Sequence, residues 1–161
     1  MKKYLKYAGI CALILAAISF ILVIACDAID FEYGGDAKGT DVIFAKGDCD
    51  GLDKALAGLF GFIFLLVAMV ILAVGFILPL VGKGLDAKIA GILNIVAAVL
   101  LIVGGILIIC TKNSWLDAND VPSSMKKYYD LTAEYAIAGI LSIVAGVVAL
   151  APAYADFLDK K

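Results

Sequence analysis

The chain has 161 residues, of which 64% are hydrophobic, and its formal net charge is only −2. Its mean hydropathy of +1.06 predicts a protein embedded in a lipid bilayer, because roughly half of the residues of soluble domains are apolar. The 13 basic residues are all lysines, and the sequence contains neither arginine nor histidine. The absence of these two residue types argues against a histidine general base, a zinc or haem site and an arginine phosphate clamp. We therefore expect no enzyme, no catalytic residues, no cofactor, no metal and no nucleic-acid partner.

Four uncharged apolar stretches are long enough to cross a bilayer, which requires about 20 helical residues. They cover residues 7–26, 55–81, 89–110 and 135–155. The predicted fold class is an all-α membrane protein, a four-transmembrane-helix bundle that forms a single integral membrane domain over residues 1–161.

The first stretch has two interpretations. It follows Lys2, Lys3 and Lys6 and ends in Val-Ile-Ala-Cys at Cys26, which is compatible with a bacterial lipoprotein signal that is cleaved before Cys26 and leaves three spans. However, the apolar run is longer than the core of about 7–15 residues in a typical signal, and its end resembles the end of the third stretch at Cys110. We therefore expect a retained first span.

The first connecting segment, residues 27–54, contains an alternating pattern followed by turn residues. Ile29, Phe31 and Tyr33 alternate with acidic residues, a glycine-rich run follows at 34–39, and an apolar triplet occupies 42–44. Alternation and turn residues in this order predict a β-hairpin that lies over the helix ends.

The second connecting segment, residues 111–134, is rich in turn-forming residues. Asn113, Asp117, Asn119, Asp120 and Pro122 predict a turn-rich cap. The run that follows, residues 123–129, predicts a short amphipathic helix that approaches the fourth span.

The charges are distributed unevenly along the chain. Segments 27–54 and 111–134 contain twelve of the fifteen acidic residues and six lysines, a net charge of −6. Lysines flank the opposite ends of the spans, at both termini and in the tight turn at 82–88. By the positive-inside rule, both termini are cytoplasmic in the cell membrane and the two acidic segments are outer loops. Aromatic residues at both levels predict two interfacial belts, formed by Tyr4, Tyr7 and Tyr154 and by Trp115, Tyr128, Tyr129 and Tyr135.

The spans contain an internal repeat. Residues 89–99 (IAGILNIVAAV) and 137–147 (IAGILSIVAGV) share nine of eleven residues. Residues 6–10 resemble 88–92, and residues 55–59 resemble 136–140, at offsets of 82 and 81. Self-similarity at a fixed spacing indicates a tandem duplication, here of a two-helix hairpin.

Small residues recur at helical spacing on all four spans. In lipid, close backbone approach along small-residue faces and side-chain hydrogen bonds hold helices together. The predicted helix-packing residues are Gly91, Asn94, Ala98, Gly139, Ser142 and Gly146. We expect these faces to pack partly within the bundle and partly between protomers, and Asn94 either bonds a neighbouring helix or lines a pore.

The sequence contains four cysteines. Cys26, Cys49 and Cys110 are all predicted at the outer side, where disulfides are permitted. A Cys26–Cys49 disulfide would fix the hairpin to the membrane surface, and Cys26–Cys110 is the competing pair. Cys11 lies in the first span and is expected to pack as a small apolar residue.

With two inner termini, a longer first outer loop, a tight inner turn and a shorter second outer loop, the chain resembles claudin-like four-span proteins. It departs from them because its first outer loop contains no tryptophan and its candidate cysteines, Cys26 and Cys49, lie far apart. The opening Lys-Ile-Ala-Gly-Ile-Leu at 88–93 also resembles small bacterial four-span membrane proteins of unknown function. This second resemblance implies a fold and no activity.

The four predicted spans contain no aspartate, glutamate, lysine, arginine or histidine. Ion-coupled transporters and proton relays need such residues at membrane depth. We therefore expect a non-catalytic integral membrane protein that assembles laterally in the bilayer, with itself or as a subunit of a larger complex. The alternative is an oligomeric pore whose path lies between protomers.

Overall fold

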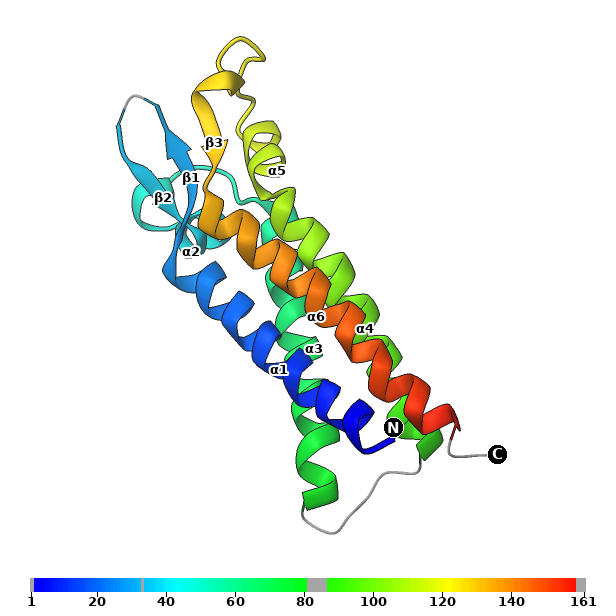
Figure 1. Cartoon of the computed structure of the whole chain (residues 1–161). Helices are drawn as coiled ribbons and strands as arrows, with labels where there is room; N and C mark the ends of the chain where they lie inside the picture. Colours follow the sequence, from blue (N-terminus) through cyan, green and yellow to red (C-terminus); the bar gives the residue numbers. More distant parts are fainter. Residues whose placement is uncertain (1, 33, 81–86, 159–161) are drawn as a thin grey trace.

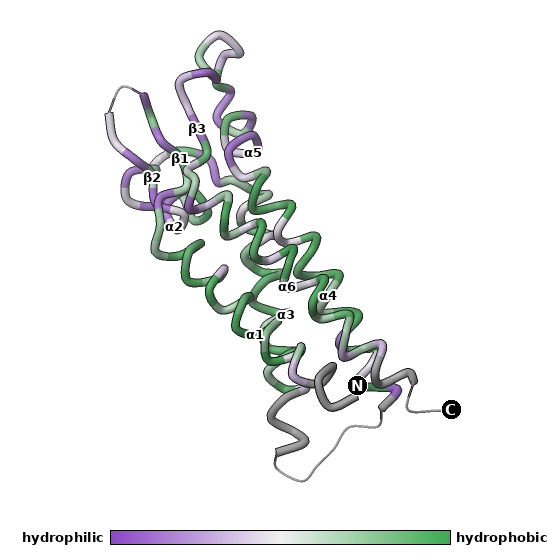
Figure 2. The backbone as a smooth tube through the Cα atoms, viewed as in Figure 1, coloured by the Kyte–Doolittle hydropathy of each residue, from purple (hydrophilic) through white to green (hydrophobic). Residues whose placement is uncertain are grey.

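The computed structural model describes residues 2–32, 34–80 and 87–158. Its main elements are four long helices, α1 (Lys2–Ala25), α3 (Leu56–Leu80), α4 (Ala87–Ile109) and α6 (Ala133–Leu158). Within the described residues, these four helices are long and apolar enough to cross a membrane, as their continuous hydrophobic colouring in Figure 2 shows. The prediction of four apolar helices of spanning length is therefore confirmed.

Each long helix packs beside two others, in the cyclic order α1, α3, α4, α6. The contact between α4 and α6 is the most extensive of the four and that between α1 and α3 is the least extensive. Consecutive helices of this cycle run in opposite directions, so α1 begins and α6 ends at the same end of the molecule (Figure 1). Residues 81–86, which include Lys83 of the predicted tight turn, lie outside the described residues, as do Met1, Tyr33, Lys160 and Lys161.

Small residues lie inside the helical part and β-branched residues lie outside it. Ala16, Ala68, Ala98 and Ala145 are fully buried. By contrast, the outward positions of the same helices are mostly isoleucine and valine, such as Ile14, Ile18, Val70, Val99, Ile140 and Val147. This distribution suits a hydrocarbon environment, because apolar side chains face lipid at no cost while small side chains bring the helix backbones together.

The two connecting segments fold together at one end of the helices. The first forms β1 (Asp27–Phe31), β2 (Asp36–Lys38), α2 (Gly39–Phe44) and the 3-10 turn η1 (Gly47–Cys49). The second forms α5 (Thr111–Ala118), the 3-10 turn η2 (Lys126–Tyr128) and β3 (Tyr129–Leu131). The strands make an antiparallel sheet in the order β2-β1-β3, in which Ile29 pairs with Leu131. We call these elements, from β1 to η1 and from α5 to β3, the cap; Figure 1 shows it opposite the end where α1 begins.

The predicted hairpin is present, but its second strand was placed wrongly. Asp36–Lys38 is the strand, whereas the apolar triplet at 42–44 belongs to α2. Val42 and Ile43 are consecutive and both buried. Successive side chains of a strand point to opposite faces, so a strand with one face in solvent would bury only one of the two. A helix that is enclosed on two sides can bury both. Ala45 ends α2 in the left-handed conformation (φ 52°).

The turn-rich second segment is also more ordered than predicted. Its first part is the helix α5, which continues directly from α4 because Ser114 N–H donates to the Cys110 carbonyl at 3.0 Å. In place of the predicted helix at 123–129, the chain forms only the single turn η2 before entering β3. The strand β3 forms because it pairs with β1, about 100 residues earlier in the chain, as in the pair Ile29 and Leu131. Local sequence propensity cannot predict a pairing between such distant segments.

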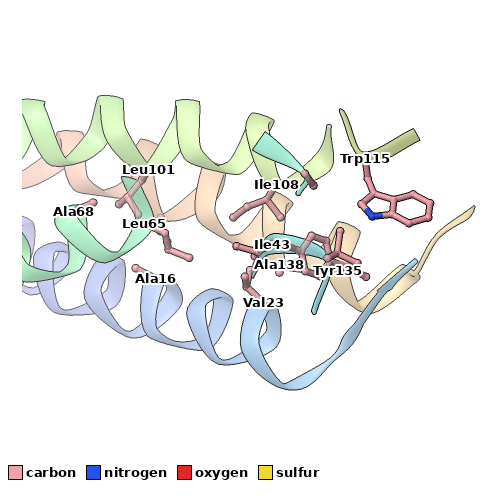
Figure 3. Close-up of a cluster of buried hydrophobic side chains, with 14 of the residues drawn as sticks. Ala16, Val23, Ile43, Leu65, Ala68, Leu101, Ile108, Trp115, Tyr135 and Ala138 are labelled. Atoms are coloured by element: carbon pink, nitrogen blue, oxygen red, sulfur yellow. The ribbon is translucent and has the colours of Figure 1, made fainter. Parts of the chain in front are cut away.

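The aromatic belt predicted at the cap end is wrong for two of its members. Tyr135 is fully buried and Trp115 is only 3% exposed. Figure 3 shows Tyr135 among Ile43, Val23 and Ala138, with Trp115 farther toward the cap. Tyr135 therefore lies where the cap meets the helices and Trp115 lies within the cap, so neither ring faces a lipid interface.

Candidate functional site: the helix interfaces and the cap

The α4–α6 interface is built on backbone contact at glycine. A Cβ atom added to Gly139 would lie 2.8 Å from the Gly105 carbonyl oxygen, and one added to Gly146 would lie 2.8 Å from the Ala98 carbonyl oxygen. Neither glycine has room for a side chain, because each faces the backbone of the opposite helix. The two helices therefore approach as closely as their backbones permit.

Serine hydroxyls add hydrogen bonds to this packing. Ser142 Oγ donates to the Leu101 carbonyl at 2.8 Å, across the α4–α6 interface. Ser19 Oγ donates to the Ala138 carbonyl at 2.7 Å, from α1 to α6. Both serines are fully buried, and each of these two hydroxyls is satisfied by a carbonyl of a neighbouring helix.

The structure places the predicted packing residues as follows. Ala98, Gly139, Ser142 and Gly146 all lie at the α4–α6 contact, within one chain. Gly91 is buried, and Asn94 is partly buried and has an interaction partner. The faces that these residues form are thus used to assemble the chain itself.

A third close contact joins α3 to α4. A Cβ atom added to Gly61 would lie 2.9 Å from the Gly104 carbonyl oxygen. Closer to the cap, Gly58 faces Thr111 and Ile43, and a Cβ atom added to Gly58 would lie 2.9 Å from both Cγ2 and Oγ1 of Thr111. The importance of Gly104 was missed at the sequence level, although the Gly104-Gly105 pair in an otherwise bulky span is a signal for it: one glycine faces α3 and the other faces α6.

Side chains of α5 hold the two connecting segments together. The Asn119 amide accepts a hydrogen bond from Asp53 N–H at 2.8 Å and donates to the Asp53 carbonyl at 3.1 Å. Ser114 Oγ accepts a bond from Ala57 N–H at 3.1 Å, which satisfies one of the free amides at the start of α3. The sequence did not indicate these roles, because each side chain bonds a segment more than 50 residues away.

An aromatic cluster forms the outer part of the cap. The ring centroids of Phe31 and Tyr129 are 5.3 Å apart, and that of Trp115 lies 6.0 Å from Phe31 and 5.9 Å from Tyr129. Beside this cluster is an open pocket of about 310 Å³, lined by Phe31, Glu32, Met125, Tyr128 and Tyr129. Its lining combines residues of β1 and the hairpin turn with residues of the second connecting segment.

The structure does not support the predicted Cys26–Cys49 disulfide or its competitor Cys26–Cys110. All four cysteines are free, and no two of them lie close together. The Cys26 carbonyl accepts the Gly39 N–H at 3.0 Å at the base of the cap. From Gly39 the chain turns into α2 and η1, which carries Cys49 away to a separate buried position.

We expect four reduced thiols with unequal reactivity. Burial, followed by the carboxylates of Asp41 and Asp48, raises the pKa of the Cys49 thiol, which lowers the fraction of reactive thiolate at any given pH below that pKa. At pH 8, Cys49 should react with iodoacetamide at least about tenfold more slowly than the exposed Cys110, and its rate should rise with pH. Peptide mapping after timed alkylation measures both rates. An intact mass that increases by 2 Da on reduction would reveal a disulfide and contradict the prediction.

Known proteins give no independent guide to this site. Among the described residues, no group of three histidine, cysteine, aspartate or glutamate side chains could hold a metal ion. No protein-family model, curated protein or solved structure matches the chain, so the comparisons lend no support to a claudin-like identity.

Proposed function

We propose that the chain is a non-catalytic integral membrane protein that assembles laterally in the bilayer, with itself or as a subunit of a larger complex. In this proposal α1, α3, α4 and α6 span the membrane, both termini are cytoplasmic and the cap faces outward. The absence of aspartate, glutamate, lysine, arginine and histidine from the predicted spans supports a non-transporting membrane domain. The net charge of −6 on segments 27–54 and 111–134 supports the orientation. Among the described residues, the helix interior is packed with small side chains such as Ala16, Ala68, Ala98 and Ala145, as expected of a structural membrane domain.

A duplicated helical hairpin explains the arrangement of the helices. In a duplicated hairpin, α1 corresponds to α4 and α3 corresponds to α6. The contact between α1 and α6 then has its counterpart in the contact between α4 and α3. The contact between α4 and α6 has its counterpart in the contact between α1 and α3. At the offsets of 82 and 81, Val23 stands where the second half has Gly105, and Leu65 stands where it has Gly146. These bulkier side chains explain why α1 and α3 have the less extensive contact.

The observation that carries lateral assembly is the exposure of α1 and α3. Only 22% of the α1 span and 28% of the α3 span are buried, compared with 44% of the α6 span. Between α1 and α3, the rings of Phe20 and Phe62 stack with centroids 5.2 Å apart. Because the glycine faces are already occupied within the chain, we place the contact with a neighbouring protein on the α1–α3 side.

A matched pair of substitutions tests this placement. Leu66 on α3, one helical turn after Phe62, is 41% exposed and Val147 on α6 is 57% exposed, so each position has room for tryptophan at the surface of the protomer. Leu66→Trp should reduce the native mass in mild detergent toward the 16.9 kDa protomer, whereas Val147→Trp should not. A monomeric unmodified protein, or equal effects of the two changes, would contradict assembly on the α1–α3 side.

Liposome flux separates this proposal from a pore between protomers. We expect no ion or small-solute flux above that of protein-free liposomes, because the outward positions of the spans are apolar. A small closed ring that conducts would favour the pore instead.

A further inference from the structure

We propose that the pocket in the cap binds a quaternary ammonium group. The pocket is open to solvent, has a volume of about 310 Å³ and is lined by Phe31, Glu32, Met125, Tyr128 and Tyr129. Pockets of this size accommodate small ligands. Three of its five lining residues are aromatic, one is a thioether and one is a carboxylate.

Aromatic rings attract cations because the face of the π system is negative. The structure already contains one such interaction at this site, since the Lys127 ammonium lies 4.8 Å from the centroid of the Tyr128 ring. The same ring lines the pocket. A cation that enters the pocket therefore meets aromatic surface of the kind that holds the Lys127 ammonium.

The charge of the pocket also favours a cation. Among the described lining residues, Glu32 is the one with a charge at neutral pH. Segments 27–54 and 111–134 together have a net charge of −6, so the local potential attracts positive ligands. Lys127 is the nearby opposing charge, and its side chain is exposed.

The lining distinguishes a quaternary ammonium from a primary one. A primary ammonium has three N–H donors, all of which need acceptors once they leave water. The described lining offers the Glu32 carboxylate and two tyrosine hydroxyls as side-chain acceptors, and the rest of its side-chain surface is ring and thioether. A trimethylammonium group has no N–H donor, so it enters this pocket without an unsatisfied hydrogen bond.

Backbone pairing holds the pocket in shape without a ligand. Phe31 and Tyr129 are partners in the β1–β3 register, and Glu32 N–H donates to the Tyr128 carbonyl at 3.0 Å. The pocket walls are thus joined by the sheet, which reduces the ordering cost of binding.

The protein contains a natural reporter for this site. Trp115 is the single tryptophan of the chain, and its ring contacts Phe31 and Tyr129, both of which line the pocket. Choline chloride should therefore produce a saturable change in the tryptophan fluorescence of the full chain in detergent, at constant ionic strength. The uncharged isostere 3,3-dimethyl-1-butanol should bind about three- to tenfold more weakly, because it lacks both the cation–π contact at a solvent-exposed site and the attraction to Glu32.

Charge variants sharpen the test. Glu32→Gln should weaken choline binding about three- to tenfold, and Lys127→Ala should tighten it. Asp50→Asn is the matched control, because it removes an exposed acidic group of the first connecting segment that is not among the residues lining the pocket, and it should leave the affinity nearly unchanged. No saturable response to choline, equal binding of the neutral isostere, or equal effects of the Glu32 and Asp50 changes would overturn the proposal.

Nanodiscs identify the source of the ammonium group. A Trp115 spectrum that differs between phosphatidylcholine and phosphatidylglycerol nanodiscs, and that free choline restores, points to a lipid head group. A response to free choline that is equal in both lipids points to a soluble ligand. Either result supports a quaternary ammonium site, and the absence of any response in both lipids would overturn it.

Discussion

Replacing Gly146 by leucine should lower the melting temperature of the purified protein by about 5–10 °C. A Cβ atom at this position would lie 2.8 Å from the Ala98 carbonyl oxygen and 2.7 Å from Ile102 Cγ1, so α4 and α6 must separate to admit a side chain. Overpacking costs about 1–3 kcal/mol, and more when backbone blocks the site, and each kcal/mol shifts the melting temperature by about 2–4 °C in a chain of this size. Separation also weakens the Ser142–Leu101 hydrogen bond, which crosses the same interface.

Adjacent residues provide the controls for this measurement. Val147 is 57% exposed, so Val147→Leu should change the melting temperature by no more than about 2 °C. In the other half of the repeat, Ala98→Leu should destabilise less than Gly146→Leu, because alanine already carries a Cβ, and Val99→Leu at a 53% exposed position should be neutral. Melting curves of all four variants in one detergent decide the matter. Equal melting temperatures for Gly146→Leu and Val147→Leu would mean that the repeated residues reflect a common evolutionary origin and do not mark a close helix contact.

The helices could be predicted from sequence because their signal is local. An uncharged run of about 20 residues satisfies its backbone within one helix, so its position does not depend on the rest of the fold. The repeated residues, including Gly139 and Gly146, also point to close helix packing. Whether a small-residue face contacts the same chain or another protomer is not encoded locally, since both contacts use the same residue types. The structure shows that these two glycines face α4 of the same chain.

The cap could be predicted only in part, because it depends on contacts between distant segments. The alternation around Ile29 identified β1, but the partner strand β3 and the hydrogen bonds of Asn119 to Asp53 come from a segment about 65–100 residues away. Trp115 and Tyr135 were assigned to a lipid interface because their residue types are common there. Burial of both rings requires the cap to fold over them, which no local pattern expresses.

Replacing Gly39 by alanine should loosen the cap while leaving the long helices intact. Gly39 is the first residue of α2, and its N–H donates to the Cys26 carbonyl at 3.0 Å. An added Cβ would collide with the Val23 carbonyl oxygen and would lie 2.7 Å from Cε2 of the Tyr135 ring. Neither neighbour can yield easily, because one is helix backbone and the other is a fully buried ring.

The collision therefore forces α2 away from α1 and α6. The amides of β1 and α2 should then exchange with solvent about a hundredfold faster, which corresponds to a loss of about 3 kcal/mol of local stability. Amides in the middle of α4 and α6 should exchange at unchanged rates, since the helices are held there by the contact of Gly146 with Ala98, about three helical turns from Tyr135. Hydrogen exchange followed by mass spectrometry resolves the two regions in one sample.

Thr40→Ala, at the next and only partly buried position, is the control and should accelerate cap exchange by no more than about tenfold, as expected for removal of a small side chain without a clash. If Gly39→Ala and Thr40→Ala gave the same exchange rates, close contact at Gly39 would not be what attaches the cap to the helices.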